Sequence, residues 1–245
     1  MKNNLIIKNI YEKLSRELDA MEFAEPVEFV YNPLVYAEDG LEKYLRYSEG
    51  KKRVVFLGMN PGPWGMAQTG VPFGEVEAVK SFLKLNDIQV KKPKKEHDLY
   101  KVQGLACKRS EVSGKRLWGL FAKKFETPEK FFAEHFVLNY CPLLFLASSG
   151  ENRVRNLTPD KLRKSERQIL FEACDSCLRK IIEILEPNFI VGIGNFAKDR
   201  ALEALNGLDV KITKILHPSP ASPHSNKDWD KKVTLQLIES GVWQE

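Results

Sequence analysis

The chain has 245 residues, of which 43% are hydrophobic, and this length and composition predict a single α/β domain over residues 1–245. Its four cysteines are too few for a disulfide framework, and no run approaches the ~18 consecutive apolar residues of a membrane span, so a disulfide-rich or membrane protein is excluded. Lys and Arg outnumber Asp and Glu by 38 to 33, and the net charge of +5 favours a polyanionic partner without requiring one.

The amino-terminal residues lack the pattern of a secretory signal, in which a basic segment precedes an apolar stretch and a small-residue cleavage site. We therefore expect a soluble, intracellular protein with no membrane partner. The bacterial cytoplasm and nucleoid are the favoured location, and the nucleus is expected if the source is a eukaryote.

Apolar residues recur at helical spacing from Leu5 to Leu18, and a second helix is predicted over residues 37–47, after a break at residues 31–34. Both helices are expected to form a covering layer. The apolar run at residues 53–58 ends at a loop rich in Gly and Pro, which predicts a buried parallel strand. A further helix is predicted over residues 75–86.

Three later apolar runs, at residues 136–139, 189–193 and 212–216, have the same strand character. The clearest helix is predicted to begin at Thr158 as N-cap, with Pro159 in its first position, and to end before Pro187. The last helix is predicted over residues 228–240, with Gly241 as its C-cap. Strands that alternate with helices predict an α/β fold around a parallel sheet.

Polar side chains follow the predicted strands. Asn60 lies in a loop after the first strand, Asn139 ends the second, and His217 follows the last. Ligands of parallel sheets bind beyond the carboxyl ends of the strands, so these residues and Phe73 form the candidate site. Asn60 as a turn residue, Asn139 as a strand cap and His217 as a structural histidine are the alternatives, but their convergence at strand ends favours function.

Signals for a cofactor or metal are weak. The glycines after the first strand have neither dinucleotide-binding nor P-loop spacing. The Gly-x-Gly-x-x-Ala sequence at residues 192–197 lies between a strand and a helix, but the next strand leads to His217 where a ribose-binding acid should stand. The Cys-x-x-Cys pair at residues 174–177 lies within a predicted helix and is better explained as core. We expect no metal and no cofactor.

The most specific signal is an eighteen-residue segment at residues 58–75, GMNPGPWGMAQTGVPFGE. It resembles the first signature of the single-strand-selective monofunctional uracil-DNA glycosylases. The segment HPSP at residues 217–220, followed by Asn226 and Lys227, resembles the second signature of that family. Other matching segments lie at residues 31–33, 110–114, 139–143 and 156–159, so the resemblance covers nearly the whole chain.

The resemblance implies the uracil-DNA glycosylase superfamily fold, with three α/β/α layers and a central four-stranded parallel sheet. It also implies two catalytic residues: Asn60 would position the attacking water, and His217 would hydrogen-bond the uracil O2 as charge gathers there. Phe73 would stack on the flipped base, and Asn139 would read its Watson–Crick edge. The other base-binding residues implied are Gly58, Met59, Gly62 and Met66, of which the last two would surround the base C5.

A DNA-binding wedge loop, which fills the gap left by a flipped base, is implied after the second signature. Its residues are Ser219, Pro220, Ala221, Ser222, Pro223, His224, Ser225, Asn226 and Lys227. Ala221 stands where the vertebrate-type pattern usually has arginine, and Trp64 where it usually has phenylalanine. These departures leave the strength of the wedge and the strand preference open.

The function implied is that of a monomeric DNA glycosylase that acts in base-excision repair without metal, cofactor or covalent lysine intermediate. It would flip and hydrolytically excise uracil and 5-substituted uracils such as 5-hydroxymethyluracil, and deaminated purines such as xanthine, from single- or double-stranded DNA. The alternative is a non-catalytic DNA-binding protein that grips damaged bases on the same fold. A nucleoside hydrolase is disfavoured, because a free nucleoside needs neither a wedge loop nor a basic surface.

Overall fold

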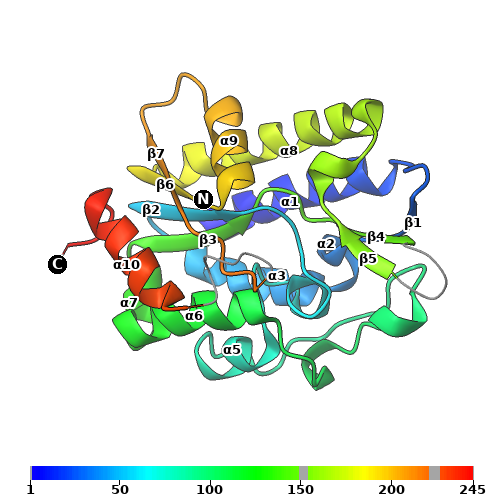
Figure 1. The fold of residues 1–245 in the computed structure, drawn as a ribbon, viewed down its shortest axis with the longest axis horizontal. Coiled ribbons are helices and arrows are strands. Elements are labelled where there is room, and N and C mark those ends of the chain that lie inside the picture. The colour runs from blue at the N-terminus through cyan, green and yellow to red at the C-terminus, as the bar shows by residue number, and fades with distance from the viewer. Residues whose placement is uncertain (1, 149–153, 221–226, 245) are drawn as a thin grey trace.

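A parallel sheet of four strands, in the order β3-β2-β6-β7, forms the centre of the molecule (Figure 1). The structure is a computed structural model and describes residues 2–148, 154–220 and 227–244. The strands are β2 (Val54–Gly58), β3 (His135–Asn139), β6 (Phe189–Ile193) and β7 (Lys211–Ile215). The prediction of an α/β fold with a four-stranded parallel sheet is therefore confirmed.

Every residue of β2 and β3 is buried, as expected for parallel strands that are covered on both faces. The register between these two strands pairs Gly58 with Asn139 at their carboxyl ends. On the other side of the sheet, the last residues of β6 and β7, Ile193 and Ile215, are also paired. The four carboxyl ends therefore lie along one edge, which brings the loops that follow them together.

Helices cover both faces of the sheet, with α8 (Lys164–Leu185) and α9 (Asn195–Ala204) on one face and α6 (Val112–Phe125) and α7 (Pro128–Phe132) on the other (Figure 1). A Cβ at Gly192 of β6 would lie 2.4 Å from the backbone nitrogen of Lys198, so α9 packs directly on the strand. On the opposite face, the rings of Phe56 in β2 and Phe121 in α6 have centroids 4.8 Å apart. The three-layer arrangement is confirmed.

A second sheet of three antiparallel strands, in the order β1-β4-β5, was not predicted. Its strands are β1 (Val27–Tyr31), β4 (Leu144–Ser148) and β5 (Val154–Leu157). Tyr31 pairs with Leu144, and Leu146 pairs with Asn156. Because β4 follows β3 after only a short loop, this sheet lies beside the carboxyl edge of the parallel sheet.

The long predicted helix begins later than Thr158. Residues Pro159–Lys161 form a 3₁₀ turn, after which the backbone is extended at Leu162 (ψ 160°), so α8 starts only at Lys164. Its predicted end before Pro187 is confirmed, since Glu186 turns into the left-handed region (φ 47°). The early break matters because it leaves Thr158 outside the helix.

The predicted helix at residues 75–86 is also shorter, because α5 spans only Val76–Ser81 and Lys84 has a positive φ of 57°. At the carboxyl terminus, α10 (Trp229–Glu239) and a left-handed Gly241 (φ 73°) agree with the prediction within one residue. The remaining elements are α1 (Asn3–Asp19), α2 (Pro33–Tyr36), α3 (Glu38–Leu45), α4 (Met66–Thr69) and the 3₁₀ turns Arg46–Ser48, Asp98–Tyr100 and Gly104–Ala106. No helix within the described ranges is long and apolar enough to cross a membrane.

Candidate active site

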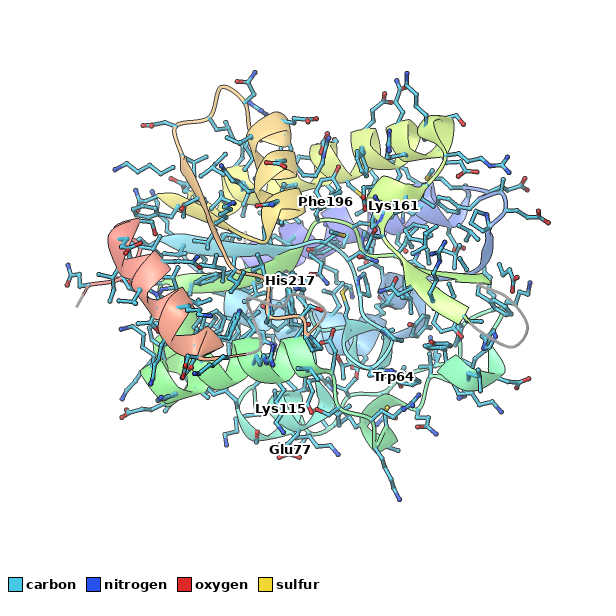
Figure 2. All side chains as sticks on the ribbon, viewed as in Figure 1. Trp64, Glu77, Lys115, Lys161, Phe196 and His217 are labelled. Carbon is cyan, nitrogen blue, oxygen red and sulfur yellow. The ribbon has the colours of Figure 1, made fainter. Side chains whose placement is uncertain are left out.

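A cavity of about 400 Å³ lies at the carboxyl edge of the parallel sheet. His217, which follows β7, is near the centre of the view in Figure 2, with Lys115 of α6 below it. The cavity is lined by seven residues that the sequence predicted, namely Met59, Asn60, Gly62, Phe73, Asn139, His217 and Ser219. It is also lined by five that the sequence analysis did not name as site residues, although all lie in segments that match the family, namely Pro63, Glu111, Ser113, Asn156 and Thr158.

Asn139 and Phe73 meet at the base of the cavity, against the main chain of Gly58. A Cβ at Gly58 would lie 2.4 Å from Asn139 Oδ1 and 2.4 Å from Phe73 Cε2, so only glycine fits there. Phe73 itself has a positive φ of 53°, which is unfavourable for a bulky residue and typical of functional sites. The local backbone thus holds an aromatic ring beside an amide.

The Asn139 amide is incompletely satisfied. Its Nδ2 donates to the thioether sulfur of Met66 at 3.3 Å, while its Oδ1 is buried and accepts no hydrogen bond from any described residue. A buried acceptor without a donor costs roughly 1–3 kcal/mol. Such an atom at the wall of a cavity is suited to accept an N–H from a ligand.

The side-chain amide of Asn60 is held by the loop that follows β3. Its Nδ2 donates to the carbonyl of Leu143 at 3.2 Å, in the loop between β3 and β4. Among the described residues no hydrogen bond reaches its Oδ1, which is therefore the acceptor available to a water in the cavity. The loop after β2 can hold this amide still because Pro61 and Pro63 restrict its backbone.

His217 is kept neutral, with its proton on a defined nitrogen. Partial burial lowers the pKa of its imidazole. Its Nδ1 accepts a hydrogen bond from the backbone N–H of Ser219 at 3.0 Å, so the proton of the neutral ring is on Nε2. The same loop is tied to α6 by Arg116, whose guanidinium donates to the carbonyl of Pro218 at 2.8 Å. His217 is therefore a preorganised N–H donor.

Glu111 is the most informative residue that the strand-end argument missed. It caps α6 by accepting the N–H of Gly114 at 3.2 Å, and its carboxyl oxygens fill the space where Gly62 and Gly65 would carry a Cβ. Burial raises the pKa of Glu111 to about 7, the charge of Glu75 adds to this, and the N–H of Gly114 opposes it. A usable signal was its position directly before the helical run that begins at Val112.

The raised pKa of Glu111 predicts a pH-dependent stability. The folded state keeps this proton up to about pH 7, whereas an unfolded chain releases it near 4.5, so stability decreases as pH rises between these values. Glu111→Gln should match the wild type at pH 5 and be more stable by about 2 kcal/mol at pH 8. Urea unfolding at both pH values measures the difference.

The exposed acid Glu77 of α5 provides the matched control, because Glu77→Gln removes the same charge from the surface (Figure 2). It should shift stability equally at both pH values. An equal shift for Glu111→Gln as well would contradict the raised pKa.

The other predicted site residues lie around the cavity or beyond the described ranges. Gly58 and Met66 do not line the cavity but support Asn139 from behind. Of the predicted wedge loop, Pro220 and Lys227 are exposed, and the positions Ala221 to Asn226 fall outside the described residues. Within the described part of the chain, no group of three or more His, Cys, Asp or Glu could hold a metal ion.

Comparison with known proteins matches the chain to one family. The Uracil DNA glycosylase superfamily matches residues 46–239. The Single-strand selective monofunctional uracil-DNA glycosylase of Rattus norvegicus is 46% identical over 233 residues, which cover 94% of this chain and 82% of that protein. The Bos taurus relative of the same name is also 46% identical, over 94% of this chain and 84% of its own length.

A solved structure shares the fold. The crystal structure of SMUG2 from Pedobacter heparinus superimposes with a TM-score of 0.66 at 14% identity, over 95% of this chain and 97% of that chain. The similarity in sequence to the mammalian proteins covers 94% of this chain, which is more than the residues 46–239 that match the superfamily. The chain therefore belongs to the single-strand selective monofunctional uracil-DNA glycosylases, which are hydrolytic DNA N-glycosylases of the uracil-DNA glycosylase superfamily.

Proposed function

We propose that this protein excises uracil from DNA by hydrolysis of the N-glycosidic bond and leaves an abasic site. The observation that carries the proposal is the buried, unpartnered Oδ1 of Asn139 in the cavity. Uracil offers an N3–H donor to this acceptor, whereas cytosine has a lone pair at the same position. An acceptor that meets a lone pair stays unsatisfied and buried, so the site selects uracil against cytosine.

His217 acts on the departing base. Breaking the glycosidic bond leaves a cationic sugar and an anionic uracil, so a donor that faces the developing oxyanion lowers the barrier by ~3 kcal/mol. The neutral His217 has its proton on Nε2, which is the nitrogen not used by Ser219. A histidine already neutral at physiological pH needs no proton transfer before it stabilises O2.

Asn60 acts on the nucleophile. An amide oxygen cannot take a proton as a carboxylate would, so it orients the water that attacks a sugar already losing its base. The hydrogen bond from Asn60 Nδ2 to Leu143 leaves Oδ1 to hold that water. Asn60 and His217 line the same cavity and act on the two separating fragments.

We further propose that 5-substituted uracils such as 5-hydroxymethyluracil enter the same cavity, and that deaminated purines such as xanthine are candidates. The cavity of about 400 Å³ exceeds what one pyrimidine needs. Gly62 lines this cavity without a side chain of its own, with the Glu111 carboxyl group against it.

The proposed substrate is DNA, both single- and double-stranded. The protein is proposed to act as a monomer inside the cell. Single strands should be processed faster than duplexes, because unstacking costs less there and Ala221 has no long side chain to fill the gap in a duplex. The single-strand selectivity in the names of the relatives agrees with this expectation.

A cleavage panel tests the proposed function. Oligonucleotides that carry uracil, 5-hydroxymethyluracil, xanthine or hypoxanthine, single- and double-stranded, are treated with the protein, and abasic sites are then opened with alkali. Cleavage at uracil, fastest in single strands, is the expected result. Tight binding to uracil-containing DNA without any abasic site would favour the alternative, a non-catalytic binder of damaged bases.

A further inference from the structure

Trp64, Tyr100 and Arg109 form a stacked group beside the cavity. The rings of Trp64 and Tyr100 have centroids 5.4 Å apart with an interplanar angle of 15°, and the guanidinium carbon of Arg109 lies 4.3 Å from the centroid of Trp64. Tyr100 is anchored in turn by its hydroxyl, which donates to the carbonyl of Val154 at 2.9 Å. Arg109 therefore rests on a fixed aromatic support.

Arg109 differs from the other arginines that contact aromatic rings. Arg53 lies over Phe189 but pairs with Glu134, and Arg200 lies over Phe171 but pairs with Asp175. Both are structural, because their charges are neutralised within the fold. Arg109 is exposed and forms no ion pair or side-chain hydrogen bond with any residue in the described ranges. Its N–H groups are available to a ligand.

Sequence neighbours place Arg109 at the rim of the candidate active site. Trp64 follows Gly62 and Pro63, which line the cavity, and Arg109 is two residues from the lining residue Glu111. Two residues of chain span at most about 7 Å, so the main chain at Arg109 lies within roughly that distance of the cavity wall. Figure 2 shows Trp64 below and to one side of His217 in the same view.

We propose that Arg109, held over the Trp64 ring, binds a DNA phosphate next to the flipped nucleotide. The inference rests on the proposed function, because it assumes that the cavity receives a base from DNA. A guanidinium presents a planar fork of N–H donors that matches a phosphate, and stacking covers only its face. Stacking also fixes the side chain before DNA arrives, which reduces the entropy lost on binding.

Affinity for undamaged single-stranded DNA provides the first test, measured by fluorescence anisotropy across a salt series. Arg109→Ala should weaken binding about tenfold at low salt and reduce the slope of log K against log salt by about 0.7, the value for one phosphate contact on a single strand. Arg109→Lys should keep the slope but lose part of the affinity, since a lysine cannot bind bidentately.

Lys211→Ala is the matched control. Lys211 is also exposed and also lies over an aromatic ring, that of Phe189, but it begins β7 and so lies at the opposite edge of the sheet. It should leave affinity and slope unchanged. Equal losses for Arg109→Ala and Lys211→Ala would overturn the proposal, because they would reflect total charge and not a site.

Neutral phosphate substitution locates the contact. Single-turnover base release is measured on oligonucleotides with one methylphosphonate at successive positions around the deoxyuridine. A methylphosphonate at one position should slow base release by the wild type. Base release by Arg109→Ala should not change when the methylphosphonate is at that position, and it should respond as the wild type does at the others. If the variant keeps the same sensitive position, Arg109 does not make the contact. A protein without glycosylase activity would release no base in this assay, but Arg109→Ala would still lose DNA affinity in the salt series. Failure of the proposed function can therefore be distinguished from failure of the phosphate site.

Discussion

Asn60→Ala should reduce the rate of uracil release about 10³-fold while the protein stays folded and still binds DNA. The substitution removes the oxygen that orients the attacking water, and well-oriented reactants contribute several kcal/mol to lowering a barrier. Binding should persist because Asn139, Phe73 and His217 still line the cavity. Single-turnover kinetics on a uracil oligonucleotide, with anisotropy on the same DNA, separate the two quantities.

Asn156→Ala serves as the control for Asn60→Ala. Asn156 also lines the cavity, and its Nδ2 donates to the carbonyl of Pro61 at 3.3 Å, so it resembles Asn60 in type and location. We expect no more than a few-fold loss for this variant. Wild-type turnover in Asn60→Ala would remove Asn60 from the mechanism, and an equal loss in both variants would assign the effect to loop packing.

Most of the parallel sheet could be predicted because β2, β3 and β6 are almost continuous apolar runs, whereas β7 at the edge of the sheet contains two lysines. Residues 54–58 and 189–193 contain no charged side chain, and each is followed by a glycine or a polar loop that ends the strand. Burial on both faces produces this simple pattern. The polar residues at the ends of these strands could then be placed at one edge without knowing any contact, which located Asn60, Asn139 and His217 together.

The antiparallel sheet could not be predicted in the same way. β1 includes the exposed Glu28, and β5 includes the exposed Arg155. Their partners are set by tertiary contacts, since Tyr31 pairs with Leu144 far along the chain. Short strands with mixed polarity give no periodic signal that distinguishes them from loops.

Glu111 and Thr158 were missed as site residues for two different reasons. Glu111 follows no strand, because it reaches the cavity from the N-cap of α6. Thr158 had every sign of an N-cap, with Pro159 after it, but the extended backbone at Leu162 interrupts the helix and Thr158 lines the cavity instead. Local capping signals identify a turn and do not reveal whether it continues as an α-helix.

Asn139→Asp should lose at least about 100-fold in uracil release. Its carboxylate has no N–H to offer, so one oxygen would still accept the uracil N3–H while the other would lie buried beside Met66 and face the O4 acceptor of uracil. Leaving a buried polar or charged group without a partner costs about 3 kcal/mol or more, which corresponds to this factor. Single-turnover rates on uracil DNA at neutral pH measure the loss.

The same variant should gain weak activity on cytosine, and more at low pH. The new carboxyl group, when protonated, would donate to the cytosine N3 and accept from the N4 amino group, which reverses the pattern that Asn139 presents to uracil. Protonation is favoured by burial, so the cytosine activity should rise as pH falls from about 8 to about 6, because only the protonated acid has the donor that cytosine N3 requires. Asn156→Asp, which places the same charge at another position on the cavity wall, should leave the preference for uracil intact. Full uracil activity in Asn139→Asp, or the same relaxed preference in Asn156→Asp, would show that the unpartnered amide oxygen is not what selects the base.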